Sequence, residues 1–355
     1  MNKILSDANK KLHKNIKSDN VPFVLRERHS MLHVCIGSSG CNFKKSGCCV
    51  MCNYGHSSLI CENEVSSLFS IIKQKESDFT SILIGTYGSL FDINEIPPKI
   101  FTKILKSLNE IDIKTVIFET HYSTVSNEKL REIRSILSDK EIVIELGLES
   151  SNQFVLNESL NKQIDLIEFK RIITTIHKFN NMYVSANVFL GAPFLTPLEQ
   201  IEDSLQTIIW AVKNGVDNVV VFPANIRKNT LIEYLYRHGR YDELSNWSLF
   251  ELLLRIPVEY QSKVYLSWFG DWDDEKIINN SNAASEQLFG DLFDKYLCTA
   301  NGLKRKELLG NFLNDVTLKK LYIEFHKKVL QKHDIDLKTR LAHEHHWINQ
   351  KLNMN

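Results

Sequence analysis

The strongest constraint on the fold is an alternation of two sequence patterns between residues 31 and 223. Short β-branched apolar runs, each a predicted strand, alternate with longer segments of helical period. The predicted strands are 31–37, 81–88, 115–120, 141–149, 182–191 and 217–223. The predicted helices between them are 62–75, 97–110, 126–137, 166–179 and 197–215. This alternation is typical of α/β folds with a parallel sheet, and its spacing allows either an open doubly wound sheet or an incomplete barrel.

After residue 223 the pattern becomes mainly helical. Helices are predicted at 230–237, 248–260, 282–297 and 304–331, with one short strand candidate at 264–268. A chain of 355 residues is long enough for one large domain or two medium ones. We predict an N-terminal segment at 1–30, a core at 31–225 and a helical C-terminal extension at 226–355 that packs on or caps the sheet.

Composition narrows the class of protein. Hydrophobic residues make up 43% of the chain and charged residues 24%, which is typical of a globular protein. The 43 basic residues balance 43 acidic ones, so a surface built entirely for nucleic acid is disfavoured, although a local basic patch remains possible. The N-terminus lacks an apolar signal core and no apolar run is long enough for a membrane helix. We therefore expect a cytoplasmic protein with no membrane partner.

Four of the seven cysteines lie between residues 41 and 52. Cys41, Cys49 and Cys52 have the spacing C-x7-C-x2-C, and Cys48 offers C-x6-C-x3-C instead. The reducing cytoplasm favours metal binding over a disulfide. The loop follows the first predicted strand, so its thiols lie at the carboxyl end of the sheet, where α/β folds place their chemistry.

Two metal sites remain open from the residues alone. One is a structural zinc site that adds His56 to the three cysteines. The other is a 4Fe-4S cluster held by Cys41, Cys49 and Cys52, which leaves one iron without a protein ligand. The zinc site corresponds to a non-enzymatic interaction module.

A three-cysteine loop after the first strand of such an array, with Met51 before the last cysteine, resembles the radical S-adenosylmethionine (SAM) superfamily. The usual superfamily spacing is C-x3-C-x2-C, so the longer first gap is a departure. With that gap, the chain is similar to the archaeosine-biosynthesis radical SAM family over residues 31–255. The segments that carry this similarity are GCCVMCNYG, GSLFDINEIP, IELGLESSN, ESLNK, GAPFLTPLEQIEDS, PANIRKNTLIEYLYRHGRY and NWSLFELL.

The resemblance implies a partial (βα)6 TIM-type barrel, a 4Fe-4S cluster and SAM as cofactors, and reductive SAM cleavage that starts radical chemistry. It implies a lyase that breaks a C–N bond on a lysine-modified 7-deazaguanine base of tRNA. A related enzyme acting on a small metabolite or a peptide is the alternative. The electron would come from a one-electron reductase, flavodoxin or ferredoxin, and a helper protein is a further expected partner.

The resemblance also assigns residues at the end of the second predicted strand. Thr86, Tyr87, Gly88 and Ser89 occupy the place where the superfamily binds the methionine amine of SAM. Glycine suits a close backbone approach, although an ordinary loop glycine explains Gly88 equally well. Asp92 and Glu95 follow either as substrate acids or, more simply, as a helix N-terminal turn.

Two carboxylates end the third and fourth predicted strands. Glu119 and Glu149 follow apolar runs, and burial of a carboxylate is costly unless it is paired, so we expect both to face the barrel mouth. By the resemblance, Glu149 with Ser150 and Asn152 contacts SAM, and Glu119 reaches the substrate as a catalytic residue. The structural alternative for either carboxylate is an ion pair with Lys162 or Arg227.

The last two strands supply further cofactor contacts by the same argument. Asn187 faces the lumen by strand periodicity, and Val221 and Phe222, with Pro223, contact the adenine of SAM. Arg227 is the second catalytic candidate, because a guanidinium there could pair with a substrate carboxylate or phosphate. Its neighbours in the family-like stretch are Asn225, Thr230 and Tyr241.

Two polar stretches near the termini are given structural interpretations. The HEHH run at 343–346, with His333, suggests a metal, but a terminal polar helix is the simpler interpretation. The lysines of the N-terminal segment are interpreted as a solvated helix face, with RNA contact as the minority alternative. They are Lys10, Lys11, Lys14 and Lys17.

Overall fold

The computed structural model describes most of the chain. The described residues are 2–14, 16, 21–28, 30–43, 47, 49–54, 57–242, 244–267, 283–329 and 334–353. Within them, no helix has both the length and the apolar character needed to cross a membrane.

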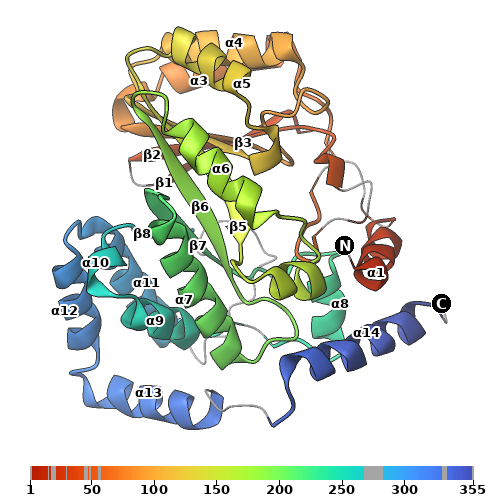
Figure 1. Cartoon of the computed structure of the whole chain (residues 1–355). Coiled ribbons are helices and arrows are strands. Elements are labelled where there is room, and N and C mark those ends of the chain that lie inside the picture. Colours follow the sequence, from red (N-terminus) through yellow and green to blue (C-terminus); the bar gives the residue numbers. More distant parts are fainter. Residues whose placement is uncertain are drawn as a thin grey trace.

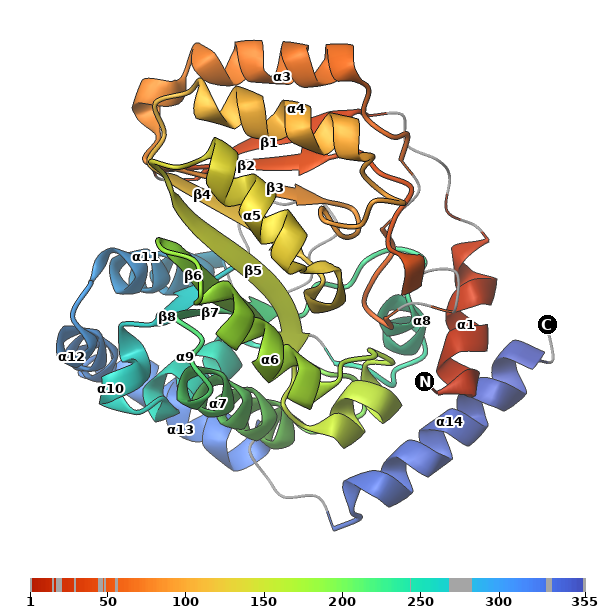
Figure 2. The same cartoon turned by 45° about the horizontal axis from the view of Figure 1, so that its top comes forward.

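One curled sheet forms the centre of the fold (Figure 1, Figure 2). Its strand order follows the chain from β1 to β8, and every neighbouring pair is parallel except β1 and β2. The strands are β1 (Phe23–Arg28), β2 (Met31–Ile36), β3 (Ser81–Thr86), β4 (Thr115–Thr120), β5 (Glu141–Glu149), β6 (Met182–Leu190), β7 (Asn218–Pro223) and β8 (Val264–Leu266). The sheet is a half-barrel, which confirms the predicted partial TIM-type fold.

Five crossover helices cover the outer face of the sheet (Figure 2). They are α3 (Glu62–Lys73), α4 (Pro98–Asn109), α5 (Asn127–Ile136), α6 (Leu166–Ile176) and α7 (Pro197–Lys213). Local sequence fixes where they begin. Ser126 accepts a hydrogen bond from the Lys129 N–H to cap α5, and Thr196 and Glu199 form a reciprocal capping box at α7.

The six predicted strands and five predicted helices of the core are present, but β1 was not predicted. Its sequence, FVLRER, carries three charged residues in its second half, so it lacks the apolar run expected of a buried parallel strand. Such a sequence suits the edge position that β1 occupies. The short strand candidate at 264–268 contains β8, which extends the sheet beyond β7.

Alternation along β4 decides which side chains face the helices and which face the lumen. Val116, Phe118 and Thr120 are buried, and the Phe118 ring lies 6.3 Å from the Phe101 ring of α4. The intervening residues, Ile117 and Glu119, are therefore on the inner face of the half-barrel. This inner face is where polar strand residues can meet a ligand.

The remaining helices form two groups (Figure 1, Figure 2). The first group packs beside α7 and consists of α9 (Asn246–Arg255), α10 (Val258–Gln261), α11 (Ala283–Cys298), α12 (Gly302–Phe312) and α13 (Val316–Val329). In the second group, α1 (Lys3–His13) and α14 (Leu337–Asn353) lie side by side, near α8 (Leu231–Arg237). The predicted division at residue 225 stays a prediction, and the segment beyond it supplies β8 as well as helices.

Candidate active site at the cysteine loop

The cysteine loop connects β2 to α3 at the carboxyl ends of the parallel strands. Its centre is held by backbone hydrogen bonds at Val50, which is fully buried. The Val50 N–H donates to the Leu160 carbonyl at 3.1 Å, and the Val50 carbonyl accepts from the Ile232 N–H at 3.4 Å. The loop is therefore fixed between the segment after β5 and the first turn of α8.

The loop between β3 and α4 supports the start of the cysteine loop. A Cβ at Gly88 would lie 2.7 Å from the Cys41 nitrogen and 1.8 Å from Glu95 Oε2, so only glycine fits this approach. Glu95 is buried, and its Oε2 accepts hydrogen bonds from the Ser89 N–H at 2.9 Å and the Ser38 hydroxyl at 3.4 Å. Burial raises the pKa of Glu95 to about 7.

Asp92 ties the same two loops together. Its Oδ2 accepts a hydrogen bond from Asn42 Nδ2 at 2.5 Å, next to Cys41, and its Oδ1 accepts from the Asn94 N–H at 2.9 Å. Since α4 begins only at Pro98, Asp92 and Glu95 do not form the helix N-terminal turn that was the simpler expectation. Both carboxylates instead contact the cysteine loop, which makes them supports of that loop.

The three predicted cluster ligands are half-buried. Burial raises the pKa of the Cys49 thiol, and the charges of Cys52 and Cys41 raise it further, whereas Lys162 lowers it. The described residues contain no group of three His, Cys, Asp or Glu side chains arranged to hold a metal ion. Metal ligation by these cysteines therefore stays a prediction, and Cys48 and His56 lie outside the described residues.

Glu149 and Lys162 form a buried ion pair beside this loop. The Lys162 Nζ lies 2.6 Å from Glu149 Oε1, and both side chains are 12% exposed. Burial disfavours the charged form of Lys162, but the charges of Glu149 and Cys49 outweigh this effect and raise the pKa of Lys162. The structural alternative expected for Glu149 is thus present, and its contact with SAM stays a prediction.

The backbone around Glu149 is adapted to this pair. Glu149 has φ of 67°, in the left-handed region that non-glycine residues rarely adopt, and the β5–β6 register shifts between Gly147 and Glu149. A Cβ at Gly147 would lie only 2.7 Å from Lys162 Nζ. Such local strain is concentrated at functional sites, because the surrounding structure must compensate for it.

Two further acids meet inside the half-barrel. Glu119 of β4 is the register partner of Glu145 of β5, and Glu145 is only 5% exposed. Burial is the main cause that raises the pKa of both carboxyl groups. The negative charge of Glu149 raises the pKa of Glu119 further, and the negative charge of Glu119 raises the pKa of Glu145 further. The Asn187 and Ser185 side chains hydrogen-bond the Glu145 carboxyl.

Glu145 was not among the predicted site residues, although the sequence carried a signal for it. Counting back from Glu149 in steps of two places Gly147 and Glu145 on the same face of β5. The bulge between Gly147 and Glu149 moves the register by one residue but leaves Glu145 paired with Ser185. A charged residue within an apolar strand is a candidate for the lumen, because burial without a partner is costly.

Two tyrosine rings, those of Tyr54 and Tyr87, lie near these acids. The Tyr87 hydroxyl hydrogen-bonds the Cys35 thiol of β2, and the Tyr87 ring lies 5.3 Å from the Tyr54 ring. The Arg227 guanidinium lies 4.4 Å from the centre of the Tyr54 ring, and its charge lowers the pKa of Glu119. The two predicted catalytic residues, Glu119 and Arg227, are therefore close enough for their charges to interact.

Other predicted cofactor residues use their side chains within the fold. Thr86 Oγ1 accepts a hydrogen bond from the Gly88 N–H at 2.9 Å. Ser89 Oγ lies 2.8 Å from each of the Thr120 and Thr124 hydroxyls. These side chains are therefore occupied by contacts within the fold, and their binding of SAM stays a prediction.

Asn152 and Val221 use their side chains within the fold, and their contacts with SAM stay predictions. Asn152 is exposed, and its Oδ1 accepts from the Phe154 N–H at 3.0 Å in a local turn. Val221 is fully buried among the outward residues of β7, whereas Phe222 is half-buried on the inner face. A contact of Val221 with adenine could therefore involve only its backbone.

Two family-like residues beyond β7 have structural roles. Thr230 caps α8 by accepting from the Glu233 N–H at 3.2 Å. The Tyr241 hydroxyl donates to the Gly191 carbonyl at 2.8 Å. Asn225 differs, because its buried Oδ1 has no hydrogen-bond partner within the described structure.

The terminal polar stretches are helical, as predicted. The HEHH run lies in α14, where His345 Nε2 bonds the Glu158 carbonyl at 2.8 Å and His345 Nδ1 lies 3.1 Å from Asn2 Nδ2. Lys10 and Lys14 are exposed, and Lys11 donates to the Leu352 carbonyl. Lys17 and His333 lie outside the described residues.

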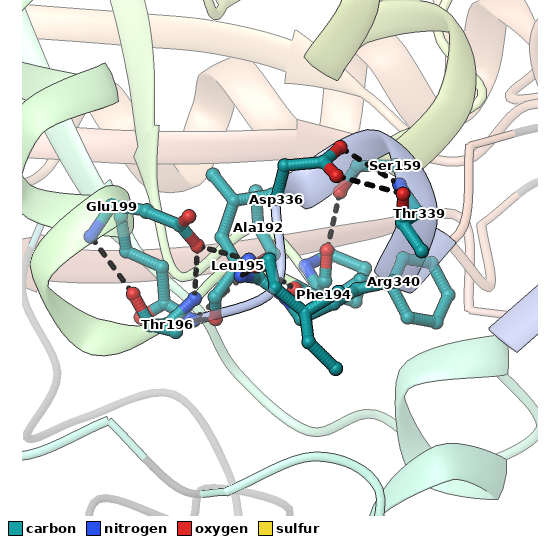
Figure 3. A network of polar contacts seen from close by, with 12 residues as sticks. Ser159, Ala192, Phe194, Leu195, Thr196, Glu199, Asp336, Thr339 and Arg340 are labelled. Carbon is teal, nitrogen blue, oxygen red and sulfur yellow. Dashed lines mark hydrogen bonds and ion pairs between the residues drawn. The ribbon is translucent and has the colours of Figure 1, made fainter. Parts of the chain in front are cut away.

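The C-terminal helix also fixes the loop that follows β6 (Figure 3). Arg340 of α14 bonds the carboxylate of Glu199 and reaches the Phe194 carbonyl at 3.5 Å. Ser159 donates to the Pro193 carbonyl at 2.6 Å from the other side. The loop at 191–196, at the carboxyl end of β6, is thereby held by elements distant in sequence.

No protein-family model matches the chain, but sequence relatives exist. Archaeosine synthase subunit beta of Methanosarcina acetivorans is 30% identical over 231 residues, covering 62% of this chain and 65% of that protein. Archaeosine synthase subunit beta of Thermococcus kodakarensis is 26% identical over 245 residues, covering 66% and 75%. The chain thus spans just under two thirds of the first relative's length and three quarters of the second's.

Among solved structures, methylornithine synthase aligns with a TM-score of 0.49 at 14% identity, covering 79% of this chain and 81% of that one. The chain is therefore similar in sequence to archaeosine synthase subunit beta over roughly two thirds of its own length.

Proposed function

We propose that the chain binds a 4Fe-4S cluster through Cys41, Cys49 and Cys52 and reductively cleaves SAM. The observation that carries this proposal is the position of the three thiols. They lie on one loop, which Val50 and Gly88 hold at the carboxyl ends of the strands, next to a lumen lined with carboxylates. The bound cluster supplies the electron that breaks a carbon–sulfur bond of SAM, and the chain binds and orients the reactants.

The donor chemistry of the loop suits the cluster. Thiolates are the usual ligands of 4Fe-4S clusters, and three of them leave one iron open for SAM. Binding to iron requires the thiols to lose their protons, which the buried Lys162 ammonium near Cys49 favours. Lys162 is in turn fixed by Glu149, so this positive charge is held in place.

The chain's own groups next to the loop would hold SAM. The backbone at Tyr87 and Gly88 lies beside Cys41, where glycine allows close approach. Glu149 offers a polar contact, and the inward Phe222 offers an apolar surface. The aromatic rings of Tyr54 and Tyr87 would help exclude water from the reacting groups.

For the substrate we propose a lysine-modified 7-deazaguanine base in tRNA, with cleavage of a C–N bond. The name of the two sequence relatives, archaeosine synthase subunit beta, supports this choice. The word subunit in that name supports a helper protein as a partner. As the electron source we propose a one-electron reductase, flavodoxin or ferredoxin of the cytoplasm. Balanced overall charge means that a local surface, and not the whole protein, would contact tRNA.

The first test is anoxic purification and reconstitution with iron and sulfide. We expect about four irons per chain, a brown colour that dithionite bleaches, and release of 5′-deoxyadenosine or another SAM fragment. Cys41→Ala, Cys49→Ala and Cys52→Ala should each lose the colour. Cys298→Ala is the matched control, because Cys298 is exposed on α11, and it should keep the colour. Stoichiometric zinc, or no SAM cleavage, would refute the proposal.

The substrate is tested separately with the reconstituted enzyme. tRNA that carries the lysine-modified base should be converted, and the same tRNA with unmodified guanine should not. Conversion of the free modified nucleoside or a lysyl peptide, with tRNA inert, would favour the small-molecule or peptide alternative.

A further inference from the structure

The inner face of β4, β5 and β6 carries an acidic floor, defined here as Glu119, Glu145, Ser185 and Asn187. We propose that this acidic floor is the substrate subsite and that it binds a protonated amine of the substrate. The inference deepens the proposed function, because a lysine-modified base carries such an amine. The argument rests on the register of these four residues, the unpaired acceptor atom of Asn187 and the charge of the two glutamates.

Strand register brings the four side chains together. Glu119 pairs with Glu145 across β4 and β5, and Glu145 pairs with Ser185 across β5 and β6. Asn187 is two residues further along β6 and hydrogen-bonds the Glu145 carboxyl. The floor therefore spans three adjacent strands on one face of the sheet.

One acceptor in the floor lacks a partner. Asn187 is 5% exposed, and its Oδ1 has no hydrogen-bond partner in the described structure. Buried polar atoms are normally paired, so this unpaired acceptor beside two carboxyl groups indicates a missing donor group.

The charge of the missing group follows from its neighbours. The charges of Lys162, which is paired with Glu149 at 2.6 Å, and of Arg227 lower the pKa of Glu119, whereas hydrogen bonds with Asn187 and Ser185 lower that of Glu145. A ligand that brings a further positive charge complements these two adjacent carboxyl groups. An ammonium group has three N–H donors, which matches Glu119, Glu145 and Asn187 Oδ1. Gly85 of β3 lets the Glu119 carboxylate lie against that strand, because a Cβ at Gly85 would be 2.6 Å from Glu119 Oε2.

Depth separates the acidic floor from the groups proposed for SAM. Glu149 lies at the end of β5, and its charge reaches Cys49. Glu145 is four residues earlier on the same strand, about 13 Å away along the strand at its usual rise and further from the mouth. A substrate amine on the floor would thus lie below SAM, with its attached chain directed toward the mouth.

The test uses the reconstituted full-length enzyme and two small probes of similar size. Cadaverine carries ammonium groups, whereas 1-pentanol has an apolar chain with a neutral end. Binding is measured by saturation-transfer NMR and by competition with the lysine-modified tRNA substrate. We expect cadaverine to bind and compete, and 1-pentanol to do neither.

Glu119→Gln keeps the shape of the side chain and removes its charge, so it should weaken cadaverine binding roughly tenfold to hundredfold. Asn187→Leu should weaken it as well, and circular dichroism checks that both variants fold. Glu168→Gln is the control, because Glu168 pairs with Arg171 on the surface of α6. It should bind cadaverine as the wild type does.

The outcomes separate the two proposals. If the enzyme cleaves SAM but Glu119→Gln binds cadaverine as tightly as the wild type, the amine subsite is wrong and the proposed function stands. If no cluster forms and SAM is not cleaved, yet cadaverine binds in a Glu119-dependent way, the proposed function is wrong and the amine subsite stands. Equal binding of both probes also overturns the subsite.

Discussion

Glu119 and Glu145 are direct register partners on adjacent parallel strands, with both carboxyl groups on the inner face of the half-barrel. Like charges opposite each other destabilise a sheet, and burial adds to this cost. The arrangement is therefore unfavourable for folding alone. It becomes useful when a ligand supplies a further positive charge beside these two carboxyl groups.

The stability of the protein should depend on the protonation of Glu145. Because the pKa of Glu145 is raised in the folded state, the folded chain binds more protons than the unfolded chain, and stability falls as pH rises above the ordinary carboxyl range. Glu145→Gln removes this loss and keeps the polar contacts. The melting temperature of this variant minus that of the wild type should therefore increase as the pH is raised from about 5 to about 8.

The control for this prediction is Glu168→Gln, whose carboxylate is on the protein surface. Its difference from the wild type should change little over the same pH range. A constant difference for Glu145→Gln at all pH values would contradict the prediction.

Gly88→Ala should disturb the cysteine loop. The new Cβ would overlap Glu95 Oε2 and approach the Cys41 nitrogen at 2.7 Å, so the two loops must separate. We expect a loss of about 1–3 kcal/mol in stability and a lower iron content after reconstitution. Chemical denaturation and iron assays measure the two effects.

Gly310→Ala is the matched control for this change. Gly310 is exposed in α12 with nothing within 4 Å of the added Cβ, so alanine should stabilise the helix by about 0.5–1 kcal/mol. Iron content should be unchanged. Equal behaviour of the two variants would show that Gly88 is an ordinary loop glycine.

Lys162→Met should be strongly destabilising, because it leaves the Glu149 carboxylate buried without its partner. The two side chains are 12% exposed and 2.6 Å apart, and breaking a buried pair typically costs about 3–5 kcal/mol. The double variant Lys162→Met/Glu149→Gln should recover part of this loss. Urea unfolding of the single and double variants tests the coupling, and additive losses would contradict it.

Arg340→Ala should loosen the loop after β6 without unfolding the barrel. The substitution removes the bonds from α14 to Glu199 and to the Phe194 carbonyl (Figure 3). We expect a stability loss of about 1–2 kcal/mol and faster hydrogen exchange at residues 191–196. Unchanged exchange there, with faster exchange across the sheet, would mean that Arg340 acts on the whole fold.

The sequence predicted the architecture because βα units are specified locally. Apolar periodicity, capping residues and prolines fixed the six core strands and five crossover helices. The edge strand β1 escaped prediction, since its charged second half resembles a loop. The cysteine spacing, with the family resemblance, predicts a cluster site on the loop after β2, and this site stays a prediction.

The acidic floor was decided only by the tertiary structure. A strand pattern tells which residues share a face, but register tells which residues of different strands meet, and only this placed Glu119 opposite Glu145. Burial, which comes from all the surrounding elements together, then raised the pKa of both carboxyls. The sequence by itself determined the fold class and the thiol loop, because these depend on near neighbours in the chain. Packing determined the partners and charge states of the acids, because electrostatics depends on distance in space.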